Sequence, residues 1–482
     1  MATADRAMPP PSPRLINEDL APAKERHWGT WHLFCMWMSY VHSIGGYTFA
    51  AGLFFLGLAS WQVLAALIIG ILIVYVAMNL TGFAGQRLGV PYPVFSRISF
   101  GVFGANLPAL IRAVIAIIWY GIQTYLASVA VVVLALRIVP SWKSLATGGF
   151  LGLSPLGWAC FLLLWVIQLL ILVRGMESIR RYQDFAGPAI WVVMFILTAW
   201  MVARAGSLGF NVSSKTLPTG KALLEFFSAI SLVVAYFSTL MLNFCDFSRF
   251  APDRRAVVVG NFWGLPINFT AFSLVSVIVT ASTIKVFGHA IFDPVEIVGT
   301  VPNTFVLILG AITFATATVG INIVANFVSP AYDLANVAPR YINFQRGGMI
   351  SAVVAILVLP WKIFSSPVAV NYFLGGLAAF LGPLYGIIIT DYYLLRRQQV
   401  DVDGLFQEEG SPYWYRGGWN PVALAAFFPS AAISAVIALV PAFKTAAPFS
   451  WFIGAALGAG IYRVLASRPG VQAVRRPATG QP

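Results

Sequence analysis

The stretch VHSIGGYTF, residues 41–49, interrupts the first long apolar segment of the chain, which runs from Trp31 to Leu58. Glycine weakens a helix because it loses more conformational freedom on folding than other residues and tolerates unusual backbone angles. One interpretation is a membrane helix broken near its midpoint at Gly45 and Gly46, where free backbone amides and carbonyls can bind a solute or a cation. The alternative is close packing of an unbroken helix against a neighbour.

The composition indicates an all-α polytopic membrane protein. Of the 482 residues, 59% are hydrophobic and 10% are charged, against about 45–50% and about 25% in soluble domains. A spanning helix needs about 20 mostly apolar residues, and the short segments of alternating polarity typical of membrane β-barrels are not found. Twelve helices are predicted, at about 30–58, 61–82, 105–136, 155–173, 185–204, 222–244, 260–285, 302–332, 348–366, 370–393, 419–441 and 448–466.

The distribution of the 30 lysines and arginines predicts the orientation. Most of them, Arg112 included, fall on the cytoplasmic side if the N-terminus is inside, as the positive-inside rule requires. We expect a multi-pass protein of the cell (inner) membrane with cytoplasmic tails at 1–28 and 468–482. An amphipathic, partly helical element is expected on the inner surface at 85–104. This distribution explains the net charge of +13 without a nucleic-acid partner.

Catalytic and metal-binding patterns are missing from the sequence. The three cysteines and four histidines stand apart, which implies neither a disulfide framework nor a metal site, and no GxxxxGK[ST] phosphate-binding run occurs. We therefore expect no cofactor and no enzymatic activity. A membrane-embedded enzyme and a channel are the alternatives from other functional classes.

Polar residues within spans are costly and often functional. Trp119 and Gln123 are four residues apart on the third predicted helix, so they share a face, and Asn322 and Asn326 repeat this spacing on the eighth. A carboxamide offers a donor and an acceptor to a cyclic urea or lactam edge, and an indole can stack on a flat ring. Each residue alone is more often packing or a contact between helices. The matched pair of polar faces favours a site for a small planar heterocycle.

Many transporters consist of two inverted repeats of five helices, in which the third and eighth helices correspond. The chain divides accordingly into a first repeat at 29–205, a second at 206–398, and two further helices within 399–467. The first helix of each repeat is commonly broken at the midplane, which agrees with the glycine pair. The sixth helix, in its stretch SLVVAYFSTLMLNFCDF (231–247), has no central glycine or proline, so its break is not predicted.

Three stretches resemble the nucleobase:cation symporter-1 family. They are PYPVFSRISFGVFGANLPALIRAVIAIIWYGIQTY at 91–125, LNFCDFSRF at 242–250 and ANFVSPAYDLANVAPRYINFQRGG at 325–348. The resemblance implies a leucine-transporter-like fold with five-plus-five inverted repeats. It also implies uptake of nucleobases, hydantoins, allantoin or related heterocycles.

The resemblance also assigns candidate solute-binding residues. Trp119 and Gln123 match the family's stacking tryptophan and its glutamine, and Asn326 matches its substrate amide, with Asn322 one turn away. The aromatic residue of the sixth helix falls at Tyr236 or Phe237, of which we favour Phe237. The polar residue at the break falls on Ser43, next to Gly46.

The coupling ion is left open by the residues that match the family's cation site. Sodium-coupled members use backbone carbonyls of the first helix and a Ser-Thr pair of the eighth, and the matching positions here are Ser39, His42, Ala317, Gly320 and Ile321. Both hydroxyls are lost, although a shift of register would bring in Thr318. A proton is the alternative, with His42 as a titrating group and Glu225 as a second candidate. A neutral histidine bonded to a nearby carbonyl is the other interpretation of His42.

The sequence thus predicts a secondary active transporter that imports a small planar nitrogen heterocycle by alternating access, coupled to H⁺ more readily than to Na⁺. The first alternative is a transporter of the same fold for another solute, such as an amino acid or thiamine. Thiamine is compatible with a cation–π contact at Trp119. The sequence does not indicate which heterocycle is bound or what the oligomeric state is.

Overall fold

The computed structural model describes residues 10–210, 212, 217–300 and 304–468. Within these ranges the chain is helical and contains no β-strand, apart from two isolated bridges. Nine of the described helices are long and apolar enough to cross a membrane. The three remaining predicted spans fall on the shorter apolar helices Ile44–Leu56, Phe344–Leu357 and Ala379–Leu395, which is consistent with twelve spans.

Nineteen α-helices are present in the described ranges, and several predicted spans consist of two consecutive helices. Their bounds are α1 Thr30–Val41, α2 Ile44–Gly52, α3 Ser60–Leu88, α4 Tyr92–Phe100, α5 Asn106–Ile138, α6 Pro155–Leu172, α7 Gly175–Ala205, α8 Thr219–Asn243, α9 Cys245–Ser248, α10 Arg254–Phe262, α11 Asn268–Phe287, α12 Pro294–Gly299, α13 Thr304–Ile321, α14 Val328–Val337, α15 Phe344–Leu357, α16 Pro360–Phe364, α17 Pro367–Ile389, α18 Pro421–Leu439 and α19 Ser450–Ala466. Three π-helical segments join or extend them: η3 Trp263–Ile267, η4 Asn322–Phe327 and η5 Thr390–Leu395.

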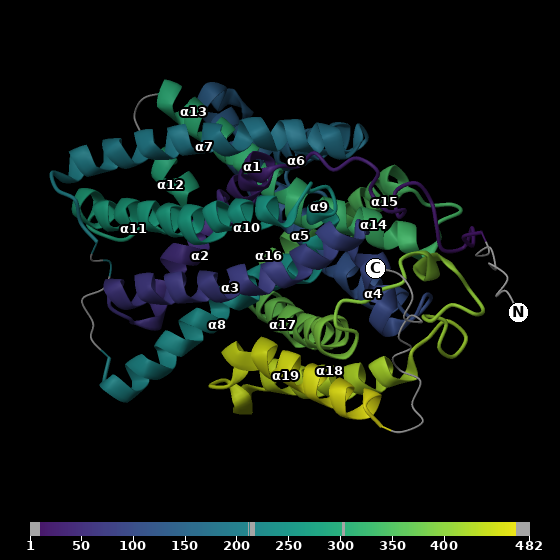
Figure 1. Cartoon of the computed structure of the whole chain (residues 1–482). Helices are drawn as coiled ribbons and strands as arrows, with labels where there is room; N and C mark the ends of the chain where they lie inside the picture. The colour runs from purple at the N-terminus through teal and green to yellow at the C-terminus, as the bar shows by residue number, and fades with distance from the viewer. Residues whose placement is uncertain (1–9, 211, 213–216, 301–303, 469–482) are drawn as a thin grey trace, which may run out of the picture.

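The long helices run side by side, and α18 and α19 lie at one edge of the bundle next to α17 (Figure 1). Small residues allow α17 and α19 to pack backbone against backbone. A Cβ atom at Gly382 would lie 2.3 Å from the carbonyl oxygen of Trp451, and one at Gly386 would lie 2.1 Å from that of Ala455. Glycine here serves close helix packing, as it commonly does in membrane proteins.

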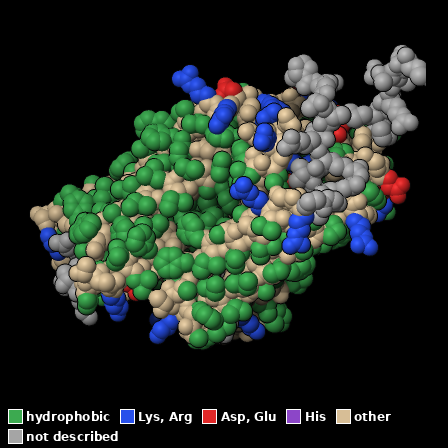
Figure 2. Space-filling view, turned by 60° about the horizontal axis from the view of Figure 1, so that its bottom comes forward, with side chains coloured by type: hydrophobic (Ala, Val, Ile, Leu, Met, Phe, Trp, Pro, Cys, Tyr) green, Lys and Arg blue, Asp and Glu red, His purple; other side chains and the backbone are tan. Residues whose placement is uncertain are grey.

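The surface is apolar over a broad area. Figure 2 shows a face dominated by hydrophobic side chains, with lysines and arginines gathered towards its margins. Large exposed side chains include Leu163 (54%), Val192 (58%) and Phe195 (58%). Soluble monomers rarely expose such extended apolar surface, whereas lipid accommodates it. The protein is therefore a multi-pass membrane protein.

The helix α4 differs from the prediction for 85–104. A helix forms there, but all nine residues of Tyr92–Phe100 are buried, so the helix does not expose the polar face expected of an amphipathic surface element. The loop 396–420 and the segment before α1 cover this end of the bundle: Arg97 Nη1 donates to the Leu405 carbonyl over 2.9 Å, and the Ser12 amide donates to the Phe406 carbonyl over 2.8 Å. This cover buries residues whose polarity suggested exposure.

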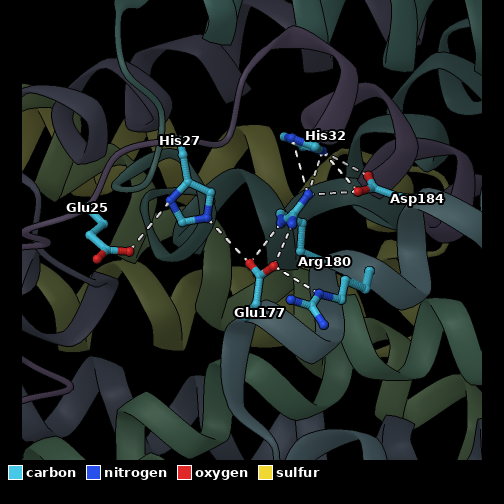
Figure 3. Close-up of polar contacts among 7 residues, drawn as sticks. Glu25, His27, His32, Glu177, Arg180 and Asp184 are labelled. Carbon is cyan, nitrogen blue, oxygen red and sulfur yellow. Dashed lines mark hydrogen bonds and ion pairs between the residues drawn. The ribbon is translucent and has the colours of Figure 1, made fainter.

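A polar cluster fixes the start of α1 against α7 (Figure 3). His32 Nδ1 lies 3.0 Å from Asp184 Oδ1, and Arg180 donates from Nη1 to Asp184 Oδ2 over 3.0 Å. Glu177 accepts from Arg180 Nε over 2.9 Å and lies 3.4 Å from His27 Nε2. These contacts anchor the first half of the first span to α7, and they lie at the opposite end of α1 from its break.

Candidate solute-binding site

The first span is broken where the polar stretch predicted a break. The helix α1 ends at Val41, and α2 begins at Ile44. His42 and Ser43 have non-helical backbone angles (φ −81°, ψ 70° and φ −128°, ψ 163°). Ser43 Oγ then accepts a hydrogen bond from the Gly46 amide over 2.9 Å, so Ser43 is the N-cap of α2. The prediction of a break is confirmed, but the break lies two residues before the glycine pair, which belongs to α2.

Close approach explains both glycines. A Cβ atom at Gly46 would lie 2.4 Å from the Val41 carbonyl oxygen, so only glycine lets the chain fold back over the end of α1. A Cβ atom at Gly45 would lie 3.1 Å from Gln123 Nε2 and 3.8 Å from Tyr236 Oη. The broken turn thus brings α2 against side chains of α5 and α8.

Gln123 and Trp119 lie on α5 at the level of the break. Gln123 is 4% exposed, and its Oε1 accepts no hydrogen bond from any described residue. Trp119 is partly buried against the hydrophobic core one turn earlier. A buried amide oxygen without a partner is rare in native proteins, which makes Gln123 a candidate ligand-binding residue.

Asn322 and Asn326 lie in the π-helical segment η4, between α13 and α14. Such segments are rare and often mark functional sites. Asn322 Nδ2 lies within hydrogen-bond distance of three acceptors: the Tyr120 carbonyl (3.1 Å), Thr124 Oγ1 (2.9 Å) and Gln168 Oε1 (2.8 Å). Asn326 Nδ2 donates to Asn322 Oδ1 over 2.9 Å. Asn322 is therefore occupied by protein contacts, whereas the side chain of Asn326, 6% exposed, makes its one hydrogen bond within the described part of the chain through Nδ2, which leaves Oδ1 available.

The two aromatic candidates of α8 differ in their surroundings. Phe237 is fully buried and packs against Tyr40 and Phe269, with ring centroids 5.3 Å away in both pairs. Tyr236 is partly buried, stacks on Phe49 at 4.5 Å, and directs its hydroxyl towards Gly45. The structure thus brings Tyr236 to the broken turn and places Phe237, which the sequence favoured, in a closed aromatic cluster.

A buried ionic network lies among α5, α8, α9 and α14. Arg112 is fully buried, although the sequence counted it as a cytoplasmic charge, and its Nη2 donates to the Ala325 carbonyl of η4 over 2.7 Å. Its Nε lies 3.3 Å from Asn243 Oδ1, and Asn243 Nδ2 donates to Asp246 Oδ2 over 2.7 Å. Asp246 and Asp333 are both buried and interact electrostatically with Arg112.

A family model described as permeases for cytosine and purines, uracil, thiamine and allantoin matches residues 21–454. The chain belongs to this permease family. It is 40% identical over 461 residues to an allantoin permease of Bacillus subtilis, covering 94% of each chain. It is 34% identical over 436 residues to a purine-uracil permease of Arabidopsis thaliana, covering 89% of this permease and 72% of that relative. These relatives are permeases and not enzymes, which confirms the prediction that this chain is no enzyme.

Solved structures agree with the family. The structure of a nucleobase-cation-symport-1 family transporter in a closed conformation, with bromovinylhydantoin bound, is 25% identical with a TM-score of 0.75, covering 95% of this permease and 98% of that chain. A Na⁺-coupled sialic acid symporter, 11% identical with a TM-score of 0.61, covers 91% of this permease and 89% of that chain and shares the fold. The predicted all-α, leucine-transporter-like fold and the predicted family are confirmed. This permease is a secondary transporter of the nucleobase and hydantoin type.

The cation-site candidates do not all lie together in this permease. Ser39 and Gly320 are neighbours, since a Cβ atom at Gly320 would lie 3.4 Å from the Ser39 carbonyl oxygen. Ala317 is buried one turn earlier on α13. Glu225 precedes Tyr236 by eleven residues on α8, which is about 16 Å along a helix axis. Glu225 is therefore remote from the broken turn.

His42 faces α7 and α11. Its Nε2 lies 2.8 Å from Asn268 Oδ1, which also accepts from Trp191 Nε1 over 2.8 Å. The imidazole stacks on Phe272 at 4.8 Å and meets Trp191 edge-on at 4.9 Å. Because an amide oxygen only accepts, His42 Nε2 carries a proton in this arrangement. The Nε2 contact resembles the second interpretation, with a side-chain oxygen in place of a carbonyl, whereas Nδ1 has no hydrogen-bond partner among the described residues.

Sequence reasoning missed three residues that support the site: Gln168, Thr124 and Arg112. Gln168 is an isolated amide in the apolar run WVIQLLIL at 165–172, so an inventory of polar residues in spans contains the signal needed to find it. Arg112 was hidden by its position seven residues into a long helix, where a cytoplasmic end was expected.

Proposed function

We propose that this permease imports a small planar nitrogen heterocycle of the allantoin, hydantoin or nucleobase type by alternating access. The ring would lie at the broken first span, with Trp119 and Tyr236 on its faces. Gln123 and Asn326 would bind its polar edge, and Asn322 would hold Asn326 in place. The names of the relatives, an allantoin permease and a purine-uracil permease, support this solute class.

The carboxamide of Gln123 carries the proposal. It is buried beside Gly45, and its Oε1 has no partner in the described part of the chain. Leaving a buried acceptor unsatisfied costs about 1–3 kcal/mol. A ring N–H would satisfy it, and a carboxamide can pair with a cyclic urea or lactam edge through one donor and one acceptor. Solutes without such an edge would be rejected, because the buried amide would stay unpaired.

Alternating access fits the contacts of η4. The segment is bonded to α5 through Asn322 at its start and through the Ala325 carbonyl three residues later. In this proposal α5, α13, η4 and α14 form one unit, and the broken first span and α8 rock against it. The two inverted repeats would comprise residues 29–205 and 206–398. We place the protein in the cell (inner) membrane with both termini in the cytoplasm, because most basic residues then face inward.

Truncating the two binding amides tests the solute site. Gln123→Ala and Asn326→Ala are each expected to weaken solute binding about tenfold or more, because each leaves a polar group of the solute unpaired. Uptake of labelled allantoin, uracil, hydantoin and adenine into proteoliposomes would be measured, with unlabelled thiamine and amino acids as competitors. Saturable uptake and counterflow would distinguish a transporter from a channel.

Gln183→Ala is the matched control, since Gln183 is a buried glutamine of α7 that adjoins Asp184, whose contact with His32 lies at the end of α1 opposite the break. Unchanged uptake of all four solutes in both Gln123→Ala and Asn326→Ala would refute the site. Competition by thiamine alone would assign the permease to the thiamine branch of its family.

We expect proton coupling in preference to sodium coupling. Ala317 and Gly320 provide no hydroxyl oxygen beside Ser39, and a hard cation needs several oxygen ligands. Replacing sodium by choline should leave initial uptake unchanged, and an inward proton gradient should raise it. A strict requirement for sodium would contradict this. If His42→Gln loses the response to the proton gradient but keeps counterflow, His42 carries the proton, and exposed His289→Gln is the control.

A further inference from the structure

Gln168 is a buried amide that the proposed solute contacts do not use. It lies in the apolar helix α6 and is 1% exposed. Its Nε2 donates to the Leu164 carbonyl over 3.0 Å and lies 3.2 Å from Thr124 Oγ1. Its Oε1 accepts from Asn322 Nδ2 over 2.8 Å. A side chain that costs desolvation and is fully paired with neighbours has a structural or a positioning role.

The orientation of the Gln168 amide is fixed by a main-chain group. The Leu164 carbonyl can only accept a hydrogen bond, so the nitrogen of Gln168 must point to it. The oxygen of Gln168 is then the atom that faces Asn322, and it requires a donor there. The Tyr120 carbonyl of α5 also only accepts, so it likewise requires the nitrogen of Asn322 to face it.

The orientation of the Asn322 carboxamide in turn fixes that of Asn326. Because the nitrogen of Asn322 faces Gln168 and the Tyr120 carbonyl, its Oδ1 is left to accept from Asn326 Nδ2 over 2.9 Å. This hydrogen bond holds the nitrogen of Asn326 towards the protein. Asn326 Oδ1 is accordingly the atom of this carboxamide that is left to face away from Asn322.

We propose that Gln168 is a positioning residue that, through Asn322, orients the Asn326 carboxamide so that its oxygen faces the solute. This rests on the proposed function of Asn326 as a solute-binding amide. Together with Gln123 Oε1, which has no partner among the described residues, it gives the site two acceptors. The solute class would then be heterocycles that present two N–H donors to these acceptors. Analogues in which one of these N–H groups is replaced by N-methyl would bind more weakly.

Gln168→Met tests the relay, because methionine has a similar length and makes no such hydrogen bonds. We expect the Kd of allantoin and of uracil to rise about fivefold, which corresponds to one lost hydrogen bond, with the maximal transport rate kept. The preference for uracil over N-methyluracil should fall. Gln183→Met is the matched control and should leave affinity and preference unchanged.

A double-mutant cycle separates positioning from general packing. If Gln168 acts through Asn326, Gln168→Met should cause no further loss of binding in the Asn326→Ala background. Equilibrium binding of labelled allantoin and labelled uracil to purified protein would be measured for the four proteins, over concentrations high enough for the weakest. An equal loss in both backgrounds, or no loss in Gln168→Met alone, would overturn the relay. No loss in Asn326→Ala alone would instead overturn the solute site.

Gln168→Glu keeps the test decisive if the methionine variant does not fold. A protonated glutamate preserves the pattern, because its hydroxyl can donate to the Leu164 carbonyl while its carbonyl accepts from Asn322. Binding should be close to that of the parent protein at acid pH and weaken as the pH rises and the carboxylate forms. A Kd for Gln168→Glu that follows the parent's pH profile would contradict the relay.

Discussion

Replacing Arg112 with methionine is expected to abolish transport and to lower the yield and melting temperature of the purified permease. Arg112 is fully buried and lies among Asp246, Asp333 and the Ala325 carbonyl. Removing Arg112 leaves its two acceptors, the Ala325 carbonyl and Asn243 Oδ1, without this donor, at a cost of about 1–3 kcal/mol for each buried group. Thermal unfolding in detergent and uptake by proteoliposomes would be measured for Arg112→Met.

Two further variants identify the cause of the effect of Arg112→Met. The control Arg255→Met removes an exposed arginine and should change neither quantity. Adding Asp246→Asn and Asp333→Asn should recover part of the lost stability, because the unpaired negative charges disappear with them. Transport should stay low, since the Ala325 carbonyl still lacks its donor. Full stability and full transport in Arg112→Met would show that the network is dispensable.

Gly46→Ala is expected to abolish solute binding while the bundle still folds. The new Cβ atom would lie 2.4 Å from the Val41 carbonyl oxygen. Because the backbone fixes the position of Cβ and the carbonyl belongs to the main chain, no side-chain rotation relieves the clash. The break must open instead, which displaces Ser43 and moves Gly45 relative to Gln123. The Kd for allantoin and the melting temperature would be measured together.

Gly52→Ala is the matched control in the same helix, because nothing lies within 4 Å of a Cβ atom at Gly52. Alanine is favoured over glycine inside a helix by about 0.5–1 kcal/mol, so Gly52→Ala should bind as the parent does and melt no lower. Normal affinity in Gly46→Ala would mean that the turn is not held as tightly as the structure indicates.

Much of the fold could be predicted from the sequence, because every span in lipid must be apolar and must satisfy its backbone hydrogen bonds within a helix. Uninterrupted apolar length predicted the helices, and the polar stretch at 41–49 predicted the break. The pair Asn322 and Asn326 could also be predicted, since a spacing of four residues places two side chains on one face.

Other features depend on tertiary contacts that a sequence pattern does not contain. Tyr236 and Phe237 are adjacent, and only the packing of α8 decides which of them reaches Gly45. Arg112 was predicted to lie on the cytoplasmic side because charged side chains are usually exposed. Inside the bundle it instead contacts Asn243, which is bonded to Asp246. The burial of α4 likewise depends on a loop some 300 residues further along the chain, as the separation of 308 residues between Arg97 and Leu405 shows.

The π-helical turn at Asn322–Phe327 also sets the rotational phase of everything that follows it in the span. A π turn closes over one residue more than an α turn, and one residue corresponds to a rotation of about 100° in an α-helix. Excising a single residue there would turn Val328–Val337 about its axis and carry Asp333 away from Arg112. The one extra residue of the π turn thus lets Asn326 face the solute while Asp333, on the same span, faces Arg112.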